Sequence, residues 1–91
     1  MTEAAFFTLT DDIQLAFDAV VDSGSEQELF ISGYLNGHFS LVVSQCLNSA
    51  KLSVADLDEA MQASLSKAFA DGELELKDQE QVKAFWQNCL K

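Results

Sequence analysis

Three side chains of this 91-residue sequence have the chemistry of a covalent catalyst: the single histidine, His38, and the cysteines Cys46 and Cys89. A thiol becomes an effective nucleophile when an imidazole lies within hydrogen-bond reach of the sulfur. Cys46 follows His38 by eight residues in one predicted helix, which separates them by about 12 Å along the axis. Cys89 could approach His38 only through tertiary packing, which the sequence does not specify. We therefore predict that the protein is not an enzyme.

His38 follows Tyr34 by one helical turn, in the middle of an apolar helix face. We expect a core or half-buried imidazole that is hydrogen-bonded to a tyrosine, a carboxylate or a backbone carbonyl, because buried polar groups need partners. The alternative is a small-ligand-binding domain with a pocket around Tyr34 and His38. No CxxC pair and no Asp-x-Asp-x-Asp-Gly loop occurs, so we predict no metal site and no cofactor. The cysteines are typical of inert, reduced thiols.

The second candidate site is a group of acidic residues on the first predicted helix. The chain has 15 acidic residues against five lysines and no arginine, for a net charge of −10. This balance excludes a nucleic-acid-binding surface, which needs clustered basic residues. Asp11, Asp18 and Asp22 lie together on the polar side of the first predicted helix, in a region to Ser49 that has no lysine. They form either a merely solvated face or a recognition surface for a basic protein partner. The leading hypothesis is therefore a non-enzymatic protein-binding or adaptor module that uses this acidic helical surface.

Apolar residues recur at steps of three and four throughout the chain, which predicts helices, and no segment alternates with period two. Ser25 and Glu28 form a capping-box pattern, and Ser53 is placed to cap a third helix. Asp71-Gly72 is a helix stop. We predict one domain over residues 1–91 with helices at about 3–22, 26–48, 54–71 and 76–90. The fold class is all-α, an antiparallel four-helix bundle with a long central second helix, against which Trp86 is predicted to be buried.

Each predicted helix has one apolar face that is expected to be buried. These faces comprise Phe6, Leu9, Ile13, Ala16, Phe17, Val20 and Val21 in the first; Phe30, Ile31, Tyr34, Leu35, Phe39, Leu41, Val42 and Cys46 in the second; Val54, Leu57, Met61, Leu65, Ala68 and Phe69 in the third; and Val82, Phe85, Trp86, Cys89 and Leu90 in the fourth.

Small residues line the other side of the central helix, among them Gly33 and Gly37. Each glycine costs a helix about 1 kcal/mol relative to alanine, so we expect a packing reason for the pair. We predict that Gly33 and Gly37 lie against another helix of the same chain. A homodimer seam is the alternative, and we favour a monomer.

The segment from Leu29 to Ala50 has no formal charge and is long enough to span a bilayer. Polar residues such as Asn36 and Ser40 interrupt it throughout, so we predict a buried helix without membrane contact. The N-terminus lacks the basic region of a signal peptide. We expect a cytoplasmic protein.

The run Glu28-Leu-Phe-Ile-Ser-Gly-Tyr-Leu-Asn-Gly-His38, followed by Gly72-Glu-Leu and Lys77-Asp-Gln79, resembles the YfcL family of small bacterial proteins. The sequence departs from the family at Asn36, where a basic residue is expected, and at Glu75-Leu76, where a Ser-Pro pair is expected. The resemblance implies a bacterial cytoplasmic helical domain and implies no particular activity.

Overall fold

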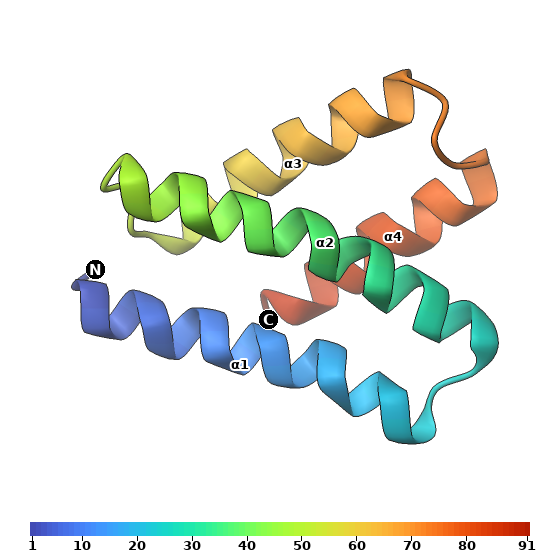
Figure 1. Ribbon diagram of the computed structural model, residues 1–91, viewed down its shortest axis with the longest axis horizontal. Coiled ribbons are helices and arrows are strands. Elements are labelled where there is room, and N and C mark those ends of the chain that lie inside the picture. The colour runs from blue at the N-terminus through green and yellow to red at the C-terminus, as the bar shows by residue number, and fades with distance from the viewer.

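Four α-helices make up the computed structural model, which describes residues 1–91 (Figure 1). They are α1 (Glu3–Ser23), α2 (Glu26–Asn48), α3 (Val54–Ala70) and α4 (Leu76–Cys89), joined by short connections. Each helix begins and ends within one residue of its predicted bounds. The all-α bundle predicted from the sequence is confirmed.

Local hydrogen bonds explain where three of the helices begin. The hydroxyl of Thr2 accepts from the backbone N–H of Ala5 at 3.1 Å and starts α1. Ser25 and Glu28 form the predicted capping box at the start of α2, and the Ser53 hydroxyl caps α3. These bonds satisfy backbone donors that the first turn of a helix leaves free. Glu75, at the start of α4, makes no such bond.

Two helices end at a residue in the left-handed backbone region. Gly72 has φ of 80°, and the N–H of Glu73 donates to the carbonyl of Ala68 at 3.3 Å to close α3. Ala50 has φ of 55° after α2, and the next N–H, that of Lys51, closes α2 in the same way. Glycine occupies this conformation without steric cost, whereas alanine does not.

The central position belongs to α2, which packs against each of the other three helices. Figure 1 shows α1 running beside α2 in the opposite direction, α3 on the other side of α2 and α4 crossing behind it. The core lies around the buried face of α2. It consists of Phe6, Ile13, Phe17, Ile31, Leu35, Phe39, Val42, Cys46, Leu57, Met61, Leu65, Val82 and Trp86.

Trp86 is fully buried beside Phe39 of α2, with ring centroids 6.0 Å apart, as the sequence predicts. Its indole N–H donates to the Asp58 carboxylate on α3 at 2.8 Å. This bond joins α4 to α3 and satisfies the one polar atom of a buried indole.

Some predicted core residues are exposed. Val21 is 69% exposed, Phe30 47%, Leu41 57% and Val54 39%. Each lies at an edge of its apolar face or at a helix end, where no neighbouring helix covers it. Periodicity gives the direction of a buried face, but its width depends on the neighbours.

The prediction that Gly33 and Gly37 lie against another helix is wrong. Both are exposed, and a Cβ atom added to either would have no neighbour within 4 Å. The small residue that faces a neighbouring helix is Ser32, which is buried and donates to the Phe17 carbonyl of α1 at 3.0 Å. Close packing between α1 and α2 therefore involves the residue next to the glycine stripe.

None of the four helices combines the length and the hydropathy needed to cross a lipid bilayer.

Candidate functional site

The largest hollow of the molecule lies between α2 and α3, and we call it the α2–α3 groove. It has a volume of about 440 Å³ and is open to solvent along one side. Its walls come from α2, α3 and the connection to α4. The lining residues are His38, Leu41, Gln45, Ala60, Ala63, Ser64, Lys67, Ala68, Asp71 and Glu73.

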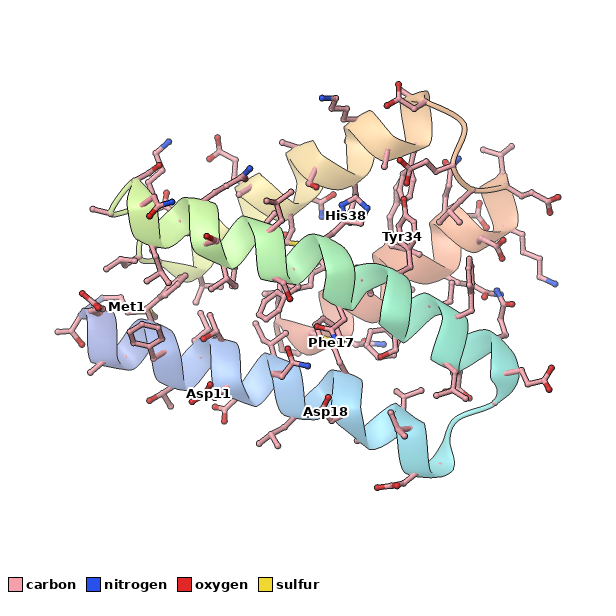
Figure 2. The ribbon with its side chains drawn as sticks, viewed as in Figure 1. Met1, Asp11, Phe17, Asp18, Tyr34 and His38 are labelled. Carbon is pink, nitrogen blue, oxygen red and sulfur yellow. The ribbon has the colours of Figure 1, made fainter.

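His38 is half-buried in this groove, and Figure 2 shows it on the side of α2 that faces α3. Its Nδ1 atom is 2.7 Å from the hydroxyl oxygen of Ser64 on α3. The Tyr34 ring lies 4.8 Å from the imidazole, centroid to centroid. The expected half-burial is confirmed, but the partner is a serine and none of the three expected groups.

Tyr34 connects α2 to the segment after α3. Its hydroxyl donates to the Glu73 carboxylate at 2.9 Å. Burial raises the pKa of Tyr34 to about 12, with a further contribution from the hydrogen bond to Glu73 and from the charge of that carboxylate. The phenol is therefore neutral and donating over the physiological range.

His38, Gln45 and Ser64 bring hydrogen-bonding groups to the groove, where three alanines also line the wall. Tyr34 is not among the lining residues. The wall contains one ammonium group, that of Lys67, and the carboxylates of Asp71 and Glu73. Ser64 lies inside α3, where backbone N–H groups donate within the helix and are not free to bind an oxyanion. The arrangement suits ligand binding through hydrogen bonds better than acyl transfer.

The two cysteines do not join this groove. Cys46 is buried in the core and Cys89 is half-buried at the end of α4; both thiols are free. Burial raises the pKa of Cys46, with a smaller contribution from the nearby Asp56 carboxylate. Burial also raises the pKa of Cys89, to about 11. Both are neutral thiols at pH 7, which are poor nucleophiles.

The second predicted site lies apart from the groove. Asp11, Asp18 and Asp22 are all exposed on α1, and Figure 2 shows Asp11 and Asp18 on a different helix from Tyr34 and His38. The Asp18 carboxylate accepts from the Gln14 amide at 3.1 Å.

Two apolar side chains share this face and were missed in the sequence. Phe7 is 43% exposed and Leu15 is 65% exposed. Steps of four, four, three and four residues separate Phe7, Asp11, Leu15, Asp18 and Asp22, so all five project from one side of α1. That spacing was the available signal. We call these five residues the acidic stripe.

Comparisons with known proteins give one consistent result. A protein-family model described as "YfcL protein" matches residues 8–91. The "Uncharacterized protein YfcL" of Escherichia coli (strain K12) is 38% identical over 73 residues, which cover 80% of this chain and 79% of that protein. No solved structure matches the chain.

Proposed function

The chain belongs to the YfcL family, and from its own surface we propose that it is a non-enzymatic protein-binding module of the cytoplasm. The acidic stripe contacts a basic partner, and the remaining helices hold α1 in place. Nucleic acid and membrane are not among its partners, and the module acts as a monomer without a cofactor.

The observation that carries this proposal is the composition of the acidic stripe. Three carboxylates and two exposed apolar side chains share one helix face, and no lysine occurs before Lys51. A merely solvated face needs no exposed Phe7 or Leu15. Apolar area next to unneutralised charge favours a partner that supplies both basic and apolar groups.

A triple substitution of Asp11, Asp18 and Asp22 by asparagine tests the proposal. We expect the variant to remain folded and to lose the proteins that the wild type captures from a bacterial lysate. Wild-type capture should weaken at high salt, because the Debye length falls to about 3 Å at 1 M. Captured proteins would be identified by mass spectrometry.

The matched control changes the same amount of charge elsewhere. Glu59, Glu75 and Glu80 are exposed on or beside α3 and α4, and their replacement by glutamine should leave capture unchanged. Equal capture by the wild type and both triple variants would reject the acidic stripe as a recognition surface.

The second candidate function is binding of a small polar ligand in the α2–α3 groove. The favouring observation is that the paired His38 and Ser64 line an open volume of about 440 Å³, a size within the range of ligand sites. The test is an NMR screen with small zwitterionic and aromatic polar fragments.

In this screen, fragment-induced shifts should centre on Ser64 and disappear in Ala63→Trp, which fills the groove. Ala55→Trp, exposed on the same helix outside the groove, should still bind. Shifts absent at Ser64, or unchanged by the Ala63 substitution, would reject this candidate.

A further inference from the structure

A second groove runs between α1 and α2, beside the acidic stripe. It has a volume of about 350 Å³, and we call it the α1–α2 groove. Its lining residues are Phe7, Thr10, Asp11, Gln14, Phe39, Ser40 and Val43. Phe7 and Asp11 thus belong both to the groove and to the acidic stripe, which makes the two features one continuous surface.

The α2 side of this surface has no charged residue. Ser40 lines the groove, and Gly33 and Gly37 are exposed on the same helix with open space above them. No formal charge occurs between Leu29 and Ala50. The backbone of a partner helix can therefore approach α2 closely here, and no charged side chain of α2 opposes its charges.

The α1 side requires positive charge from whatever covers it. Asp11 and Asp22 are eleven residues apart, which corresponds to about 17 Å along the helix. A second copy of this chain would bring its own net charge of −10 and is repelled. A basic polymer without apolar groups would leave Phe7 and Leu15 uncovered.

We infer that the α1–α2 groove receives a basic amphipathic helix of a partner protein, whose apolar side chains enter the groove and whose lysines or arginines face Asp11, Asp18 and Asp22. This inference rests on the proposed function and adds the shape and position of the partner. Helix-in-groove recognition of this kind depends on apolar anchors at helical spacing, with flanking charge setting orientation.

The test uses two fluorescently labelled peptides of about 18 residues, or five helical turns. Both contain only leucine and lysine in equal numbers; one has its leucines at helical spacing and the other is scrambled. The full-length protein is titrated into each peptide, and binding is followed by fluorescence anisotropy. We expect the amphipathic peptide to bind about tenfold more tightly than the scrambled one.

A matched pair of substitutions locates the binding. Ser40→Trp fills the groove and should weaken amphipathic binding about tenfold. Ser66→Trp, exposed on α3 and outside both the α2–α3 and the α1–α2 groove, should leave it unchanged. Circular dichroism checks that both variants are folded.

The outcomes separate this inference from the proposed function. In one outcome, both peptides bind equally, and binding is unaffected by Ser40→Trp but lost in the triple asparagine variant. That result rejects the α1–α2 groove as the binding site and retains the acidic stripe as the recognition surface. Binding that survives the triple asparagine variant overturns the proposed function itself. A dimer in sedimentation that Ser40→Trp dissociates would show a second copy on this face and overturn the inference.

Discussion

At the scale of single residues, Ala50 carries the least favourable backbone conformation of the chain. Its φ of 55° is in the left-handed region, which costs a residue with a Cβ atom about 1–2 kcal/mol. The carbonyl of Cys46 at the end of α2 requires this conformation, because Lys51 closes the helix by donating to it. Glycine is the residue best suited to the position.

Ala50→Gly is therefore expected to stabilise the protein. The relief of strain exceeds the extra entropy that glycine has in the unfolded chain, which leaves a gain of about 0.5–1 kcal/mol in the free energy of unfolding. Urea denaturation measures the change. Ala63→Gly, within helix α3, is the control and should cost about 1 kcal/mol. A loss of stability in both variants would contradict the argument.

Tyr34 is the only tyrosine, so its ionisation can be followed directly by tyrosinate absorbance. The titration midpoint should be about 12 instead of the ordinary 10.0. Glu73→Gln should lower the midpoint only in part, because burial, the largest cause, remains.

The free energy of unfolding should depend on pH through the same tyrosine. Folding favours the neutral phenol, so its contribution is complete below pH 10.0 and is lost as the pH rises through about 12. Tyr34→Phe should show a smaller alkaline loss of stability than the wild type. A wild-type midpoint near 10.0 would show that the hydroxyl is free in solution.

The sequence singled out two polar residues of α2 but did not indicate their partners. His38 and Tyr34 were singled out by type and spacing, whereas Ser64 and Glu73 are 26 and 39 residues further along the chain. Asp58, the partner of Trp86, was missed for the same reason. Pairing across helices depends on their relative rotation, which periodicity within one helix does not define.

At the scale of the elements, the predictable features were those set by local chemistry. Ser25 and Ser53 mark helix starts because their hydroxyls bond to nearby backbone N–H groups. Gly72 marks a helix end through its own φ. The exposure of Gly33 and Gly37 was not predictable in this way, because a stripe of small residues has the same sequence pattern whether or not a helix covers it.

The exposed glycines of α2 lead to a second stability prediction. Gly33→Ala and Gly37→Ala should each stabilise the protein by about 1 kcal/mol, because alanine is the better helix former and each new methyl group enters open space. Thermal unfolding should show a rise in Tm of about 4–8 °C for each.

Gly72→Ala is the control and should change the free energy of unfolding in the opposite direction, since φ at this position is 80°. It should destabilise the protein by about 1 kcal/mol. A loss of stability in Gly37→Ala would mean that something covers this face of α2 in solution.

At the scale of the whole molecule, charge opposes folding. A net charge of −10 is confined to a body of 35 × 31 × 19 Å. The Debye length is about 30 Å at 0.01 M salt and about 3 Å at 1 M. Most of the carboxylates therefore repel one another at low ionic strength and are screened at high ionic strength.

We expect the Tm to rise by several degrees between these salt concentrations, which corresponds to about 1 kcal/mol. The triple asparagine variant at Asp11, Asp18 and Asp22 should show a smaller rise, because it carries less charge. Scanning calorimetry in sodium chloride measures both. A Tm independent of salt would show that the carboxylates interact too weakly to affect stability.

The central position of α2 also sets the order in which the molecule opens. Each of α1, α3 and α4 packs mainly on α2, so an outer helix can detach while the other two stay docked. The amides of α2 are released only when the entire core dissolves, and they should be the slowest to exchange with deuterium. The amides of α1 exchange through a smaller, sub-global opening, and a partner bound to the acidic stripe would slow that exchange without changing the rate in α3.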